Sequence, residues 1–236
     1  MKYLIILLLF LCCIPDTFCQ RTECNVNVYT GFFYYRGNGA TSNSVINYGI
    51  FYAPAGTSNV YGTRPGFSFS AEGQATRITA ANWLYGAGLS YDQLESKVNI
   101  YKVQNNPELV IIGQTYLYDA EGNTGLKNRY ITIHPFAGKR FITGHFKLDV
   151  YGGIAVALCL SSMEQGSAGI TGSNDMIKVH NSYNHPNIDV RPAIQLRAGY
   201  KRAGILIGYL YGVTNYSDAS KVYSNFLRIG VGYTLR

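Results

Sequence analysis

The sequence predicts an all-β fold, a single antiparallel transmembrane β-barrel of eight strands with long loops at one rim and short turns at the other. Strand-like runs longer than the roughly 5–6 residues usual in soluble proteins are joined by connections that alternate between long and short. Within the runs, apolar residues alternate with polar ones. After the N-terminal segment, no apolar stretch approaches the roughly 20 residues that a membrane helix needs.

The N-terminal segment has the pattern of a secretory signal. Lys2 is followed by an apolar run over residues 4–14 and then by a short polar stretch. We expect cleavage after Cys19. The sequence thus divides into a signal peptide at 1–19 and a single barrel domain at 20–236.

The predicted strands follow from the apolar alternation and from the turn residues between runs. They cover residues 25–36, 64–78, 82–97, 127–141, 145–161, 188–201, 204–216 and 223–236. Short turns fall at 79–81, 142–144 and 202–203, whereas the loops at 37–63, 98–126, 162–187 and 217–222 are longer. Because the chain enters from the periplasmic side after export, the long loops are expected to be extracellular.

The count of eight has one alternative. Strand-like segments at 45–53 and 109–119 lie within the first two long loops. They would either extend hairpins above the membrane or add two membrane strands, and both totals are even, as barrels of this class require. The regular alternation of long and short connections is lost with ten strands, so eight is favoured.

Period-two alternation predicts which face of each strand is apolar. The predicted apolar faces are Phe67, Phe69, Ala71 and Ala75; Phe146, Leu148, Val150, Ile154, Val156, Leu158 and Leu160; Val190, Ile194, Leu196, Ala198 and Tyr200; and Leu227, Ile229, Val231, Tyr233 and Leu235. Strand length and charges of both signs on the polar faces indicate that the apolar faces meet lipid. Aromatic residues near strand ends predict an interfacial girdle: Phe32 to Tyr35, Trp83, Tyr85, Tyr91, Tyr130, Phe141, Tyr200, Tyr209, Tyr211 and Tyr233.

The chain resembles the small outer-membrane β-barrel family of Gram-negative bacteria, which includes OmpA-like, OmpX-like and PorT-like porin-superfamily barrels. The export signal and the segments 129–141, 146–153 and 227–233 carry the resemblance. It implies location in the bacterial outer membrane. One departure is the C-terminus, where the chain ends in Arg236 instead of the aromatic residue common in such barrels.

Charged residues on the polar faces predict an interior network. An eight-stranded barrel is only wide enough for side chains to fill it, so charges inside must pair. The predicted structural network is Glu72, Asp92, Asp149, Arg197 and Arg228, in which Glu72 pairs with Arg197 or Arg228. The alternative role for these residues is a gated proton or ion path.

No catalytic, cofactor or metal site is predicted. His134 shares an inward face with Thr132, but no Ser-His-acid set is visible at a readable spacing. Asp175, His180 and His185 share the third long loop, where a solvated loop is favoured over zinc because the segment is glycine-rich. The chain is therefore predicted not to be an enzyme.

The formal net charge of +7 raises the question of whether the partner is nucleic acid or anionic lipid. The chain holds no long basic run, and an exported protein rarely meets DNA, so nucleic acid is not an expected partner. Basic residues near the predicted periplasmic rim are either a girdle for anionic lipid head groups or solvated turn positions. They are Arg77, Lys139, Arg140, Lys201, Arg202 and Arg236.

The function predicted from these patterns is that of a non-enzymatic integral outer-membrane protein with a structural or surface-interaction role. Its expected partners are outer-membrane lipids and an extracellular ligand or protein that meets the loops, and the expected state is a monomer. Two alternatives stay open. One is a narrow channel or secretion-associated barrel, and the other is a secreted lipocalin-like carrier, which would need an apolar lumen.

Overall fold

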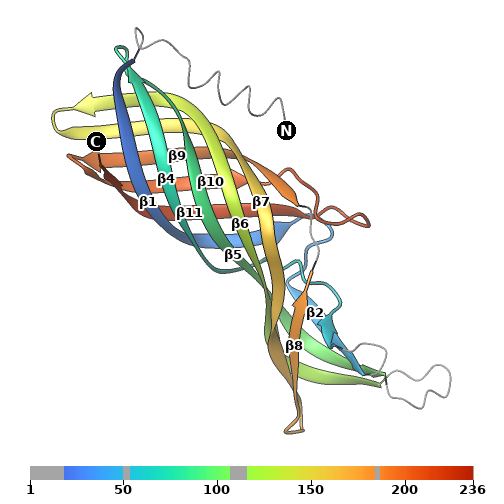
Figure 1. Ribbon diagram of the computed structural model, residues 1–236. Helices are drawn as coiled ribbons and strands as arrows, with labels where there is room; N and C mark the ends of the chain where they lie inside the picture. The colour runs from blue at the N-terminus through green and yellow to red at the C-terminus, as the bar shows by residue number, and fades with distance from the viewer. Residues whose placement is uncertain (1–18, 50–53, 107–115, 184–186, 236) are drawn as a thin grey trace.

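The fold was analysed in a computed structural model that describes residues 19–49, 54–106, 116–183 and 187–235 (Figure 1). The predicted signal peptide lies almost entirely outside these residues. The strands are β1 (Cys19–Arg36), β2 (Asn43–Gly49), β3 (Gly56–Thr57), β4 (Arg64–Thr79), β5 (Trp83–Asn106), β6 (Tyr116–Thr143), β7 (Phe146–Ile170), β8 (Met176–Ser182), β9 (Ile188–Tyr200), β10 (Ala203–Tyr211) and β11 (Tyr223–Thr234). Within the described residues, no helix is long and apolar enough to span a membrane.

Eight of these strands close into a ring of antiparallel pairs. The order around the ring is β1, β4, β5, β6, β7, β9, β10 and β11, and β11 returns to β1. A closed ring leaves no unpaired strand edge within the bilayer, which is what a membrane-spanning sheet requires. The predicted transmembrane barrel is thus confirmed.

Of the two segments that raised the ten-strand alternative, the described part of the first (45–49) lies outside the ring, and the described part of the second (116–119) belongs to β6. β2 pairs in parallel with the far end of β5, from Asn99 to Asn106, and only the two-residue β3 pairs with its other side. The stretch 107–115 is outside the described residues, and from Tyr116 the chain already belongs to β6. Of the described residues, none adds a ninth strand to the ring.

The short connections gather at one rim of the barrel. The turns between β4 and β5, β6 and β7, and β9 and β10 lie there, and Asn25 of β1 stands opposite Thr234 of β11. The strand ends that the longer connections join lie at the opposite rim, where β5, β6 and β7 continue into a protruding extension (Figure 1). This arrangement agrees with the alternation read from the sequence.

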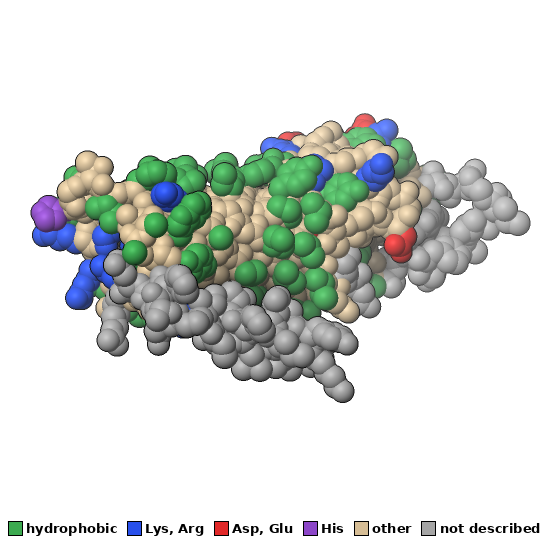
Figure 2. Space-filling view, turned by 90° about the horizontal axis from the view of Figure 1, so that it is seen from above, with side chains coloured by type: hydrophobic (Ala, Val, Ile, Leu, Met, Phe, Trp, Pro, Cys, Tyr) green, Lys and Arg blue, Asp and Glu red, His purple; other side chains and the backbone are tan. Residues whose placement is uncertain are grey.

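The outer surface of the barrel is apolar. On β7, Phe146, Ile154 and Leu160 are 65%, 51% and 54% exposed, whereas the intervening Asp149 and Ala155 are buried. Hydrophobic side chains spread over the barrel in the same way in the space-filling view (Figure 2). In a soluble barrel the apolar face would be inside. The predicted outward orientation is therefore confirmed, and a carrier with an apolar lumen is not supported.

The predicted aromatic girdle is wrong at three positions. Phe33, Tyr35 and Tyr130 are fully buried inside the barrel, although they lie near strand ends. Their positions in the period-two pattern place them on the inward faces of β1 and β6. Other members of the predicted set, including Trp83 and Phe141, are about half exposed on the outer surface, at 51% and 53%.

The strand directions separate the two cysteines of the predicted mature chain. Cys24 pairs with Ala75 close to the short-turn rim, whereas Cys159 pairs with Tyr130 toward the long-loop rim. A disulfide tolerates a Cα separation of only about 7 Å. We expect mass spectrometry of the non-reduced, digested protein to show no Cys24–Cys159 peptide, and finding one would contradict the strand directions.

Candidate functional site: the lumen and the long-loop extension

The lumen is occupied at the short-turn end by a cluster centred on Arg140. Its guanidinium donates to both carboxylate oxygens of Asp149, from Nε at 2.6 Å and from Nη2 at 2.8 Å. It also donates to both oxygens of Glu23, from Nη1 at 3.0 Å and from Nη2 at 2.9 Å. Paired carboxylates on a planar guanidinium form short, geometrically specific contacts. A cavity of about 10 Å³ lies beside these groups.

Further ion pairs and hydrogen bonds surround this cluster. Arg21 and Lys147 approach Glu23 Oε1 at 2.6 and 3.7 Å. Arg197 donates from Nη2 to Thr234 Oγ1 at 3.0 Å. The Arg140 cluster thus joins the first strand to the β6–β7 hairpin across the interior of the barrel, and Arg197 separately joins β9 to the last strand.

Arg140 corrects one sequence prediction. The sequence places it among the basic residues of the periplasmic rim, but its side chain is buried in the lumen. It continues the inward alternation of Thr132 and His134 along β6. Arg236, another member of that group, lies outside the described residues.

The middle of the lumen holds Glu72 and Arg228. Arg228 Nη2 lies 3.6 Å from Glu72 Oε2 and donates to Gln195 Oε1 at 2.6 Å, and its guanidinium carbon lies 4.0 Å from the centre of the Tyr29 ring. His134 Nδ1 lies 3.9 Å from Glu72 Oε1. Of the two arginines proposed as partners of Glu72, the structure thus brings Arg228 to it.

This geometry gives a direct test by double-mutant cycle. For Glu72→Gln and Arg228→Gln, we expect a coupling of roughly 0.5–3 kcal/mol in the free energy of unfolding, because each group partly neutralises the other. For Glu72→Gln with Arg197→Gln, the losses should add to within about 0.5 kcal/mol. Equal coupling in the two cycles, measured by urea unfolding in lipid vesicles, would contradict the observed pairing.

Asp92 and Asp189 are buried nearer to the long-loop rim. Asp92 accepts hydrogen bonds from Ser70 Oγ and, at 2.6 Å, from Thr132 Oγ1. Asp189 Oδ2 accepts from Arg191 Nε and Tyr216 OH, both at 2.6 Å, and from Ser224 Oγ at 2.8 Å. All five predicted interior residues are buried. Their partners include residues that the sequence analysis did not single out.

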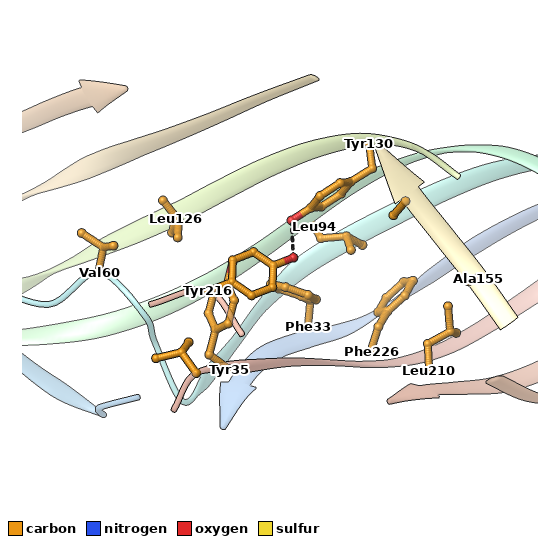
Figure 3. Packing of buried hydrophobic residues seen from close by; sticks show 12 residues of the cluster. Phe33, Tyr35, Val60, Leu94, Leu126, Tyr130, Ala155, Leu210, Tyr216 and Phe226 are labelled. Atoms are coloured by element: carbon orange, nitrogen blue, oxygen red, sulfur yellow. Dashed lines mark hydrogen bonds between the residues drawn. The ribbon is translucent and has the colours of Figure 1, made fainter. Parts of the chain in front are cut away.

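An aromatic cluster covers the lumen at the long-loop end (Figure 3). Tyr216, from the loop after β10, reaches Tyr130 on β6, and their hydroxyls lie 3.0 Å apart. Tyr35 contacts Tyr216 edge to face at a centroid distance of 5.1 Å, and Tyr61 OH donates to the Tyr216 backbone carbonyl at 2.8 Å. Tyr61 and Tyr216, from the connections that follow β3 and β10, thus reach into the barrel and cover this end.

Beyond the membrane, the extension has a hydrophobic core of its own. Strands β5, β6 and β7 continue past the barrel and are joined by β2 on one side and β8 on the other. Asn181 of β8 donates to the carbonyl of Ala55, which directly precedes β3, at 2.8 Å, so β8 also contacts the segment that pairs with β2. The core residues are Ile46, Val98, Ile100, Val103, Ala120, Ala168 and Val179. The extension is therefore a folded body and not a set of separate loops.

Two of the three loop residues considered for zinc, Asp175 and His180, lie within the described residues. His180 lies on β8 with Nδ1 3.4 Å from Gln165 Nε2, and Asp175 accepts a hydrogen bond from Ser173. His185 lies outside the described residues. Within the described ranges, no group of three His, Cys, Asp or Glu side chains is arranged to hold a metal ion.

No protein-family model and no curated protein matches the chain. Similar solved structures include Ail, the attachment invasion locus protein of Yersinia pestis, in complex with the heparin analogue sucrose octasulfate. It is 10% identical with a TM-score of 0.42, covering 92% of this chain and 100% of Ail. Neisserial surface protein A is 12% identical with a TM-score of 0.39, covering 91% of this chain and 99% of its own.

The features that decide the class of this protein are its closed ring of strands and its apolar outer surface. Closed antiparallel barrels with an outward apolar band are the architecture of outer-membrane proteins. This chain is an integral outer-membrane β-barrel. Its closer assignment to OmpA-like, OmpX-like or PorT-like barrels stays a prediction.

Proposed function

We propose that the protein is a non-enzymatic, surface-displayed barrel that presents its extension as a contact surface. The observation that carries this proposal is the second hydrophobic core above the membrane, because a mere connection between strands needs no folded body. Exposed apolar side chains on the extension, including Tyr101, Leu117 and Met176, offer contact area. The precursor would be divided into a signal peptide at 1–19 and a barrel domain at 20–236, and the mature protein would act as a monomer.

The packing of the lumen supports a structural role for Glu72, Asp92, Asp149, Arg197 and Arg228. The Arg140 cluster fills one end, and the aromatic cluster covers the other. A solute path would need both to move. We therefore expect no steady single-channel conductance in planar bilayers, and regular ion-conducting steps would favour the channel alternative.

The orientation can be tested with a thiol reagent that does not cross membranes. In a Cys24→Ser, Cys159→Ser background, Met176→Cys should react on intact cells, since Met176 is 62% exposed in the extension. His145→Cys, in the turn at the opposite rim, is the matched control and should react only after the outer membrane is permeabilised. The reverse labelling pattern would contradict the proposed display.

The interaction role can be tested on intact cells by retention on a panel of immobilised proteins and glycans. A variant with Tyr101→Ser, Leu117→Ser and Met176→Ser should lose any retention that the wild type shows, at equal surface abundance. Equal retention of the two would remove this surface from the proposal.

A further inference from the structure

A groove lies on the outer surface of the barrel beside the short-turn rim. It crosses β7, β9, β10 and β11 and has a volume of about 610 Å³, within the roughly 300–1,000 Å³ typical of small-molecule sites. Phe146, Leu148, Tyr200 and Ile205 are among its large apolar lining residues. Since this surface faces lipid, the groove opens to the bilayer and not to the lumen.

The groove exists because small residues meet there on adjacent strands. Ala198 stands opposite Leu148 on one side and Ile205 on the other, and Ala203 stands opposite Tyr200. The rings of Phe146 and Tyr200 contact each other with centroids 5.2 Å apart, forming an aromatic wall at the rim. A depression between larger side chains gives a flexible hydrocarbon chain more contact than a flat barrel surface does.

The rim end of the groove is basic. Lys201 and Arg202 form the exposed turn between β9 and β10, and His145 is exposed in the neighbouring turn. Lys201 Nζ lies 5.4 Å from the centre of the Tyr200 ring, which lines the groove. Basic side chains also gather at this end of the molecule in Figure 2.

The backbone conformation at Lys201 is one that lysine rarely adopts. Its φ of 54° lies in the left-handed region, where a turn favours Gly or Asn. A lysine at this position places a long cationic side chain at the mouth of the groove despite the less favourable backbone.

We propose that this groove binds a phospholipid with an anionic head group. One acyl chain lies over Ala198 between Leu148 and Ile205, and the head-group phosphate meets Lys201 and Arg202. Apolar contact and attraction between basic side chains and anionic head groups act together in such a site. The inference rests on the proposed orientation, which puts this rim in the periplasmic leaflet.

Native mass spectrometry of the full-length barrel, released from detergent with added phosphatidylglycerol, tests the groove. Ala198→Phe fills the depression and should reduce the fraction of protein that retains lipid several-fold. Ala71→Phe is the matched control, because Ala71 is exposed on the outer face of β4, away from the groove. Equal retention by the two variants would overturn the proposal.

The head-group contact is tested by Lys201→Asn with Arg202→Gln. Asparagine tolerates the positive φ, so the turn is kept while the charge is removed. This variant should retain several-fold less phosphatidylglycerol but an unchanged amount of phosphatidylcholine. Retention of both lipids at the wild-type level would overturn the anionic assignment.

The labelling and lipid-retention experiments distinguish an error in the proposed orientation from an error in the proposed lipid site. If thiol labelling places the short-turn rim outside the cell, the periplasmic location is lost whatever the lipid result. If labelling is as expected but Ala198→Phe retains lipid as Ala71→Phe does, only the lipid site is lost.

Discussion

Replacing Arg140 with Met should lower the free energy of unfolding by about 3–5 kcal/mol. The substitution removes the cation that bridges Glu23 and Asp149 and leaves these two buried carboxylates without it. Arg21 and Lys147 still approach Glu23, whereas among the described residues Asp149 has no other ion-pair partner within 4.0 Å. The measurement is urea unfolding of the barrel in lipid vesicles, followed by tyrosine and tryptophan fluorescence.

The matched control for this variant is Arg129→Met on the same strand. Arg129 is exposed on the outer face of β6, so the same chemical change there should alter stability by no more than about 0.5 kcal/mol. Arg140→Lys keeps the charge but not the two-sided planar geometry, and should fall between wild type and Arg140→Met. Equal stability of Arg140→Met and Arg129→Met would show that the luminal cluster contributes nothing to stability.

Replacing Ile154 with Arg should destabilise the barrel by about 2–4 kcal/mol. Ile154 lies near the middle of the exposed apolar face that runs along β7 from Phe146 to Leu160. In the bilayer this position has no water, so a guanidinium placed there must bend toward an interface or draw water inward. The measurement is again the unfolding free energy in vesicles.

Leu117 offers a control with the same exposure. Ile154 and Leu117 are each 51% exposed, but Leu117 lies in the extension. Leu117→Arg should therefore be nearly neutral, because water already covers that side chain. We infer that the bilayer surrounds the barrel but not the extension. Equal losses of unfolding free energy in the two variants would contradict this placement.

The sequence predicts the ring of strands because both signals for it, the period-two alternation and the lengths of the connections, are local. Period-two alternation can be read within a single strand, and the long and short connections follow directly from the spacing of the strands. The far ends of the strands were less predictable. The sequence predicts that this strand ends at residue 97, but β5 continues to Asn106. Its residues Val98, Ile100 and Val103 pack in the second hydrophobic core, which depends on contacts with β2 and β8.

The luminal partners could be predicted only in part. Alternation placed Asp149 inside, but its partner Arg140 was assigned to the rim because it lies beside a turn. Glu23 precedes the predicted start of the first strand at 25. The choice of Arg228 over Arg197 for Glu72 depends on how strands far apart in sequence are staggered around the barrel, which no single strand encodes.

The Arg140 cluster also implies an order of assembly. Asp149 is only nine residues from Arg140 and stands opposite it in the β6–β7 hairpin, so this pair can form as soon as the hairpin does. Glu23 is 117 residues from Arg140 and meets it only when the first strand has come round to the last. Contacts between residues so far apart in the sequence form late, and they slow the folding of the chain. Before the ring closes, Glu23 already has Arg21 of its own strand as a partner; once it closes, Arg140 also links the first strand to the β6–β7 hairpin across the interior.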